Sequence, residues 1–146
     1  MKAVKNLGLV VFFIFLFLAG TVLAQGFKVY PGAKIDDKLT KEANELAAGA
    51  GGKTPPPRAT IYVTPDAFEK VKAFYKELGK EYLMPGPAGN KRILPSGKEL
   101  KASFFIFDGA KDLMSSKSWC KIQRPYIGLD GKEGPDLTYI ILSEKK

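Results

Sequence analysis

The chain has 146 residues, with 23 lysine and arginine against 15 aspartate and glutamate residues, a single cysteine and no histidine. The lack of histidine removes the usual general base near neutral pH and the commonest transition-metal ligand, so most familiar enzyme mechanisms and metal sites are not expected. A lone cysteine excludes an intramolecular disulfide, and we expect Cys120 to be buried and inert, with intermolecular pairing as the alternative.

The first segment, residues 1–24, has the layout of a secretory signal peptide. Lys2 and Lys5 precede an apolar run from Leu7 to Leu18, and the segment ends on the small residue Ala24. We therefore predict cleavage after Ala24, export to the periplasm or the extracellular space, and no stable membrane insertion after cleavage. An uncleaved membrane anchor is the alternative, because the apolar segment is close to the shortest length that spans a bilayer of about 30 Å.

Cleavage would leave a chain of one-domain size that is still basic. Two of the 23 basic residues and none of the 15 acidic ones lie in the signal, so 21 basic residues remain and the net charge is +6. These basic residues are scattered, with no long run and no recognisable nucleic-acid motif, so we expect no nucleic-acid partner. A basic surface can attract an anionic envelope component, or it can simply keep the protein soluble.

The segment from 25 to 58 is predicted to be an N-terminal extension. Apolar spacing predicts a weak helix over residues 36–48, capped by Asp36 or Asp37. Several glycines and three consecutive prolines follow, which favour extended backbone and end the helix. We therefore predict a linker over residues 49–58.

Within this region, residues 47–54 read AAGAGGKT and fit a relaxed form of the phosphate-binding loop. A working loop of that kind follows a strand and opens a helix whose amino terminus faces the phosphates. Here the predicted helix precedes the motif and three prolines follow it. We therefore predict no nucleotide site at this segment, and we expect no cofactor.

The core domain is predicted to begin with a strand followed by the main helix. Residues 59–64, ATIYVT, alternate and are rich in β-branched side chains, which is typical of a strand. Thr64 can cap the next helix, and Asp66 with Glu69 is an alternative capping box. Gly79 is expected to end the helix by adopting the left-handed conformation.

One face of this predicted helix is apolar. At about 100° per residue, six apolar side chains fall within one arc and the charged side chains fall outside it. We predict that this stripe packs on a sheet and offers no reactive group. Its members are Ala67, Phe68, Val71, Phe74, Tyr75 and Leu78.

More strands are predicted downstream, separated by turn-rich stretches. The order of strand, helix and then several strands favours an α+β domain. We predict a core domain over residues 59–146, with an antiparallel sheet of four to five strands in β-α-β-β-β order. One main helix packs on this sheet, in addition to the weaker N-terminal helix. The downstream strands are predicted at residues 80–84, 98–107, 119–123 and 137–143.

Residues 60–107 resemble one half-module of the vicinal oxygen chelate group, which includes glyoxalases and bleomycin-resistance proteins. The pattern D-x-F-E-K-V-x-x-F-Y-K-x-L-G, here from Asp66 to Gly79, is followed by strands. The resemblance implies a unit of one strand, one helix and three strands. That group holds its metal with His and Glu, and this chain has no histidine, so no metal ligand is carried over.

The chain is also similar to small exported bacterial proteins of unknown function. These carry YPGAK after the signal, here Tyr30 to Lys34, and a T-x-D-x-F-E-K-V-x-A-F-Y-K helix, here Thr64 to Lys76. This resemblance implies a fold and an exported location, but no activity.

Four aromatic side chains form the candidate ligand or dimer face. If Ile61 and Val63 pack under the helix, alternation turns the aromatic neighbours to the opposite face of the sheet. An apolar face of this kind takes an apolar or aromatic ligand or a second copy of the chain, unless the helix at 36–48 or another strand layer covers it. The four residues are Tyr62, Phe105, Phe107 and Tyr139.

No catalytic set is predicted. Ser115 and Lys117 are close in sequence, but a serine-lysine dyad needs a buried, deprotonated lysine, which this polar run does not favour. We therefore expect an exported, non-catalytic binding or structural protein of the bacterial envelope. The alternative is a carboxylate-based hydrolase that acts on envelope polymers.

Overall fold

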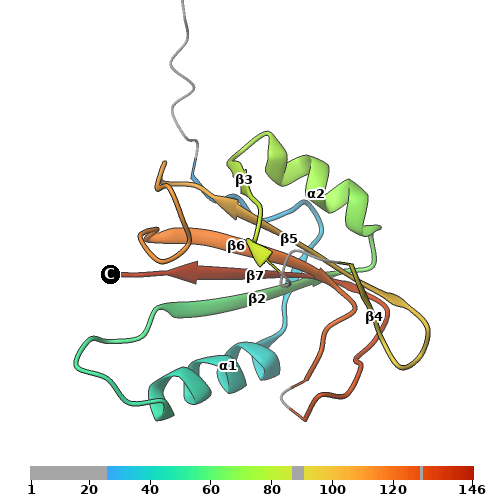
Figure 1. Cartoon of the computed structure of the whole chain (residues 1–146), viewed down its shortest axis with the longest axis horizontal. Helices are drawn as coiled ribbons and strands as arrows, with labels where there is room; N and C mark the ends of the chain where they lie inside the picture. Colours follow the sequence, from blue (N-terminus) through green and yellow to red (C-terminus); the bar gives the residue numbers. More distant parts are fainter. Residues whose placement is uncertain (1–25, 87–90, 129) are drawn as a thin grey trace, which may run out of the picture.

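Antiparallel strands and two helices make up the described part of the chain (Figure 1). The computed structural model describes residues 26–86, 91–128 and 130–146. Within these residues the strands form one seven-stranded sheet. The strands are β1 (Lys34–Ile35), β2 (Arg58–Thr64), β3 (Lys80–Tyr82), β4 (Arg92–Ile93), β5 (Glu99–Ile106), β6 (Ser118–Arg124) and β7 (Thr138–Glu144). The helices are α1 (Asp37–Gly49) and α2 (Phe68–Lys76).

The predicted α+β class and antiparallel sheet are confirmed. The strand order is β1-β2-β7-β6-β5-β3, and β4 pairs with β5 beyond this path. Strands β2, β3, β5, β6 and β7 lie within two residues of the predicted segments. The sheet exceeds the predicted four to five strands because β1 and β4 have two residues each, too few to show an alternating pattern in the sequence.

Helix α1 begins where the aspartate cap was predicted. Asp36 is the N-cap, and its Oδ1 accepts a hydrogen bond from the backbone N–H of Leu39 at 3.0 Å. The same N-terminal segment contributes β1 to the edge of β2. Its Tyr30 side chain is buried, and the backbone N–H of Tyr30 donates a hydrogen bond to the Tyr75 hydroxyl at 3.1 Å. The predicted N-terminal extension therefore packs with the sheet as part of one unit.

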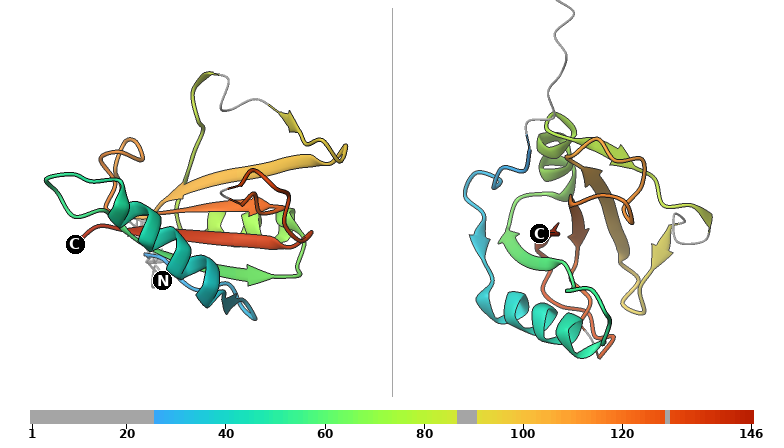
Figure 2. Two further views of the ribbon diagram at one scale, coloured as in Figure 1. Left: turned by 90° about the horizontal axis from the view of Figure 1, so that it is seen from below. Right: turned by 90° about the vertical axis from the view of Figure 1, so that its left-hand side faces the viewer.

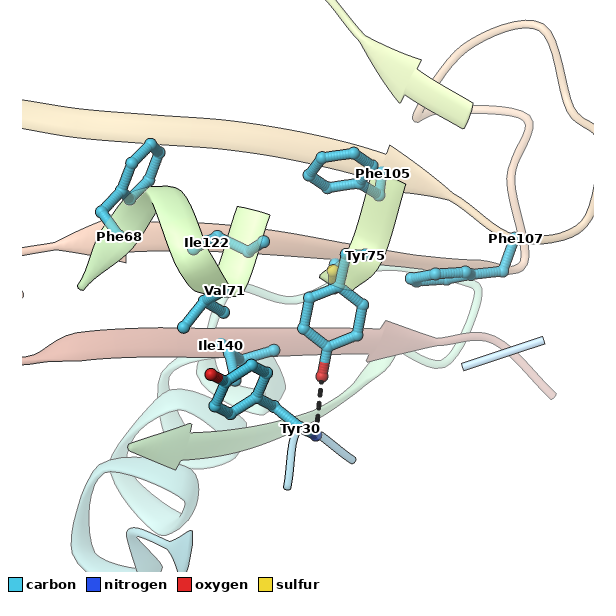
Figure 3. Close-up of a cluster of buried hydrophobic side chains, with 9 residues drawn as sticks. Tyr30, Phe68, Val71, Tyr75, Phe105, Phe107, Ile122 and Ile140 are labelled. Atoms are coloured by element: carbon cyan, nitrogen blue, oxygen red, sulfur yellow. Dashed lines mark hydrogen bonds between the residues drawn. The ribbon is translucent and has the colours of Figure 1, made fainter. Parts of the chain in front are cut away.

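Helix α2 packs most of its predicted apolar stripe against the sheet (Figure 3). Ala67, the first member of that stripe, is instead the exposed N-cap. Val71 and Tyr75 are fully buried, and Phe74 packs against the same cluster. Burying each large apolar side chain of this kind contributes about 1.5 to 3 kcal/mol. The core cluster comprises Tyr30, Phe68, Val71, Tyr75, Phe105, Phe107, Cys120, Ile122 and Ile140.

The predicted assignment of the two sheet faces was wrong. Tyr62 pairs with Ile140, and Ile140 pairs with Ile122, so these side chains lie on one face, which is the face that α2 covers. Ile61 and Val63, expected beneath α2, alternate with Tyr62 and therefore point to the opposite face. Figure 2 shows α1 on the side of the sheet away from α2. Alternation separates the two faces of a strand, but it does not tell which helix covers which face.

Both ends of α2 differ from the prediction. The N-cap is Ala67, which makes no side-chain capping hydrogen bond, so neither Thr64 nor the box of Asp66 with Glu69 caps the helix. Thr64 Oγ1 instead accepts a hydrogen bond from the backbone N–H of Asp66 at 3.2 Å, and this local turn delays the start of the helix. Gly79 follows the helix without the positive φ that was expected.

Candidate binding groove beside strand β5

The four aromatic residues predicted as a ligand or dimer face do not share an exposed surface. Phe105 and Phe107 lie in the core under α2, with 0% and 2% of their surface exposed. Tyr62 is half-buried in the same layer. Tyr139 is buried on the opposite face, with its ring centroid 5.1 Å from that of Tyr126. The hypothesis thus loses the exposed aromatic surface on which it depended.

A groove runs along the outer edge of β5, between the two short strands that pair with it. Strand β3 pairs with Phe104 to Ile106, and β4 pairs with Glu99 and Leu100, so Lys101 to Ser103 lie between them. The groove is lined by residues of α2, β3, β4, β5 and β6. Figure 1 labels these five elements. Because successive strand residues point to opposite faces, the groove reaches both sides of the sheet.

On the α2 side, the groove wall carries charges that neutralise each other. Lys101 Nζ lies 2.6 Å from Glu69 Oε1, and Lys72 Nζ lies 3.2 Å from Glu81 Oε1. The hydrogen bond from Lys101 is the main reason why the pKa of Glu69 is below its ordinary value. Glu69 is therefore held as an ionised carboxylate.

On the side away from α2, the groove brings a cation next to aromatic rings. Arg92 pairs with Leu100 and Lys121 pairs with Phe104, so both cations and the Phe104 ring lie on the same face of the sheet. Lys121 Nζ lies 5.6 Å from the centroid of the Phe104 ring. That ring lies 6.1 Å from the ring of Trp119. The strand pairing, and not proximity in sequence, creates this arrangement.

Arg92 and Lys121 are like charges in the same groove. Burial, and then the charge of Arg92, lower the pKa of Lys121 from its ordinary value. Neither residue forms an ion pair within the described residues, whereas the neighbouring Lys91 lies 3.4 Å from Glu99. Two cations held in one site without a carboxylate repel each other, and an anion between them would relieve this repulsion.

Two large apolar side chains are exposed in the groove. Leu83, which follows β3, is 79% exposed, and Ile93 of β4 is 59% exposed. Ala102 of β5, a small exposed residue, lies in the same groove. Exposed apolar groups that gather at a concave site indicate an interaction surface more often than scattered ones do. Ile93 pairs with Glu99, so it lies on the α2 side of the sheet, opposite to Arg92, Lys121 and Phe104.

The reactive side chains considered from the sequence are engaged elsewhere or buried. Ser115 Oγ donates to Asp112 Oδ1 at 2.8 Å, while Lys117 is exposed and its backbone N–H donates to Asp108 Oδ2 at 2.6 Å. Cys120 is buried, as expected, and burial raises the pKa of its thiol. These groups form no dyad in the structure.

Comparison of the chain with family models, with curated proteins and with solved structures found no match. The resemblances to the vicinal oxygen chelate half-module and to small exported proteins therefore stay predictions.

Among residues 26–86, 91–128 and 130–146, no helix is both long enough and apolar enough to cross a membrane. The same three stretches hold no group of three or more His, Cys, Asp or Glu side chains that could bind a metal ion. The predicted signal peptide, residues 1–24, lies outside the described residues.

Proposed function

We propose that the protein is a small, exported, non-catalytic binding protein of the bacterial envelope, and that the groove beside β5 is its ligand site. One observation carries this proposal: Arg92 and Lys121 share the groove, and neither forms an ion pair with the described residues. Lys121 is partly buried and Arg92 is exposed, and positive charge without a carboxylate partner at a concave site favours a bound anion.

The alternative from the sequence, a carboxylate-based hydrolase, needs a carboxyl group that stays protonated near neutral pH and acts as general acid. Each carboxylate of the groove lies close to a lysine ammonium group. The hydrogen bond from Lys101 lowers the pKa of Glu69. Glu81 and Glu99 lie 3.2 and 3.4 Å from lysine ammonium groups. This arrangement supports recognition of a ligand in preference to proton transfer.

Export is the second part of the proposal and rests on the layout of residues 1–24. The intact mass of the protein recovered from the periplasm or medium tests it. We expect a chain that begins at Gln25. A product that begins at Met1 and stays with the membrane fraction would contradict cleavage.

Trp119 provides a reporter for binding, because it is the single tryptophan of the chain and its ring lies 6.1 Å from that of Phe104. Decyl amphiphiles with anionic, neutral and cationic head groups are titrated while Trp119 emission is followed. We expect at least one of them to bind, and we expect an Ala102→Tyr variant, which fills the groove, to lose that binding.

A matched control keeps this test specific. Ala48→Tyr adds the same side chain at an exposed position of α1 and should leave binding unchanged. If no amphiphile changes the Trp119 emission, or if Ala102→Tyr binds as well as Ala48→Tyr, the groove is not the ligand site.

A further inference from the structure

We propose that the ligand is an acidic polysaccharide, a chain of sugar rings that carry carboxylate groups, and that it lies across the sheet face turned away from α2. This inference rests on the proposed binding function and names the class of its ligand. We call the part of that face over β3, β4, β5 and β6 the cationic face. Its residues are Lys80, Tyr82, Arg92, Phe104, Trp119 and Lys121.

Three aromatic rings and an ammonium group lie next to one another on the cationic face. Phe104 pairs with Tyr82 of β3 on one side and with Lys121 of β6 on the other, so these side chains point to the same face. Trp119 lies two residues before Lys121 in β6 and therefore shares this face, and its ring centroid is 6.1 Å from that of Phe104. All four side chains are partly exposed. A ligand on this face can contact the rings and a cation together.

The charges on the cationic face all have the same sign. Among the described strands, β3, β4 and β6 turn Lys80, Arg92 and Lys121 to this face, while β5 and β7 turn no charged residue to it. Helix α1 lies beside β2 (Figure 1), where its cap Asp36 contributes, after burial, to the raised pKa of Tyr139. A polyanion therefore meets positive charge over β3 to β6. The acidic residues of the strands β3 to β7 point to the α2 side: Glu81, Glu99 and Glu144.

The spacing of the cations favours a polymer over a small anion. Lys80 pairs with Ile106, the last residue of β5. Arg92 pairs with Leu100, about 20 Å back along the same strand. A single carboxylate or phosphate spans a small part of this distance, whereas a chain of linked carboxylates can contact each cation in turn. Linked weak contacts raise the affinity of the whole chain through effective concentration.

The rings decide between kinds of polyanion. A sugar ring packs its C–H groups on aromatic rings such as Tyr82 while its hydroxyls stay in water, so it gains from the rings as well as from the cations. A chain of acidic amino acids would leave the rings uncovered. A nucleic-acid base stacks on an open aromatic face, but Lys121 Nζ already lies over the Phe104 ring, 5.6 Å from its centroid. A base would displace this ammonium group, whereas a sugar carboxylate would bind it.

Probes that each lack one part of the ligand test this inference, with Trp119 emission as the readout. Oligogalacturonate carries sugar rings and carboxylates, maltooligosaccharide carries sugar rings alone, and poly-glutamate carries carboxylates alone. Galacturonate is the single acidic sugar, and oligothymidylate is the nucleic acid. We expect oligogalacturonate to bind at least about tenfold more tightly than each of the other probes. Added salt should weaken its binding, because salt screens charges on an exposed face.

Variants assign the binding to the cationic face. Lys80→Gln, Arg92→Gln and Lys121→Gln should each weaken oligogalacturonate binding about threefold or more, and Lys121→Arg, which keeps the charge, should retain it. Tyr82→Leu removes one ring and should weaken binding by a similar factor. Lys76→Gln is the matched control, because Lys76 is exposed on α2, at the opposite side of the sheet. Melting temperatures measured in parallel show that each variant is folded.

The outcomes separate this inference from the proposed function. If the anionic decyl amphiphile binds and Ala102→Tyr blocks it, but oligogalacturonate does not bind, the groove is a ligand site and the acidic polysaccharide is refuted. If poly-glutamate, galacturonate or oligothymidylate binds as tightly as oligogalacturonate, the ligand class is refuted. If no charge variant weakens binding more than Lys76→Gln does, the cationic face is not the site. If neither an amphiphile nor oligogalacturonate binds, the inference and the proposed ligand site both fail.

Discussion

The side-chain amide of Asn44 pairs with the backbone of Ala59 as a neighbouring strand would. Asn44 Nδ2 donates to the Ala59 carbonyl at 2.8 Å, and the Ala59 N–H donates to Asn44 Oδ1 at 2.9 Å. One turn away, Thr40 Oγ1 accepts from the Ile61 N–H at 3.0 Å. Strand β1 pairs with this edge of β2 at residues 62 and 63. Open sheet edges invite pairing with other chains, so α1 protects the part of the edge that β1 leaves.

Removing the Asn44 amide should therefore destabilise the protein. Asn44→Ala leaves the partly buried N–H and C=O of Ala59 without these partners, and we expect a loss of about 1 to 3 kcal/mol in the free energy of unfolding. Urea denaturation measures it. Glu45→Ala is the control, since Glu45 is exposed and makes one surface ion pair with Lys41 at 3.8 Å. Equal stability of the two variants would contradict the role of Asn44 as an edge cap.

The edge of β2 illustrates why some parts of the fold could be predicted from the sequence and others could not. The α2 stripe and strands such as β5 were predictable because burial imposes a local period on them. Asn44 carries no such signal, since an asparagine on a helix also suits a solvated face. The two-residue strands β1 and β4 exist because longer neighbours offer them backbone partners. Such pairing depends on residues far apart in the chain, so a local pattern does not show it.

Gly79 is required for close packing and not for a left-handed turn. A Cβ at this position would lie 2.8 Å from the Ile106 carbonyl oxygen and 2.8 Å from a ring atom of Phe107. Ile106 ends β5, and Phe107 is buried in the core cluster. We expect Gly79→Ala to lower the free energy of unfolding by about 1 to 3 kcal/mol, because the core must shift to make room. Thermal or urea unfolding checks it.

A second glycine serves as the control for this prediction. Gly49 ends α1, and a Cβ there meets no atom within 4 Å. Gly49→Ala should be neutral or stabilise by up to about 1 kcal/mol, since alanine favours a helix over glycine. If Gly79→Ala is as stable as Gly49→Ala, the close approach of Phe107 does not constrain the fold.

The candidate site was less predictable than the fold. Lys91 and Arg92 appeared in the sequence as scattered basic residues, and Lys121 lies in a different strand. Their grouping depends on β4 and β6 both pairing with β5. The predicted aromatic face failed for a related reason: alternation placed Phe105 correctly on one side of β5, but the helix that covers this side was assigned to the other.

The hydrogen bond between Tyr30 and Asp66 should make stability depend on pH at both ends of the range. The Tyr30 hydroxyl donates to Asp66 Oδ2 at 2.6 Å. This hydrogen bond raises the pKa of Tyr30 from 10.0 to about 12, with burial as a further cause, and it is the main cause of the lowered pKa of Asp66. The stabilisation from Asp66 is present above its unfolded pKa of 3.8 and is lost as the pH falls through the folded value. The stabilisation from Tyr30 is present below 10.0 and is lost as the pH rises through about 12.

The difference in unfolding free energy between the parent and Tyr30→Phe measures this bond. We expect the difference to be constant between about pH 5 and 9 and to shrink on either side, where one partner changes its protonation state. In an Asp66→Asn background, the same substitution should show no shrinkage on the acid side. A Tyr30→Phe difference that is flat from acid to strongly alkaline pH would show that the hydrogen bond contributes nothing.

Cys120 should react with thiol reagents when the protein unfolds and not before. Its side chain is fully buried in the cluster under α2, and burial raises the pKa of the thiol, so little reactive thiolate is present. We expect a disulfide reagent to label the native protein at least about a hundredfold more slowly than the protein in urea. An Ala102→Cys variant that also carries Cys120→Ala should be labelled at once, because residue 102 is exposed on β5. Two results would contradict this prediction: native Cys120 reacting as fast as this variant, or a disulfide-linked dimer of the oxidised protein on a non-reducing gel. Either result would show that the sheet opens at β6 far more readily than its packing implies.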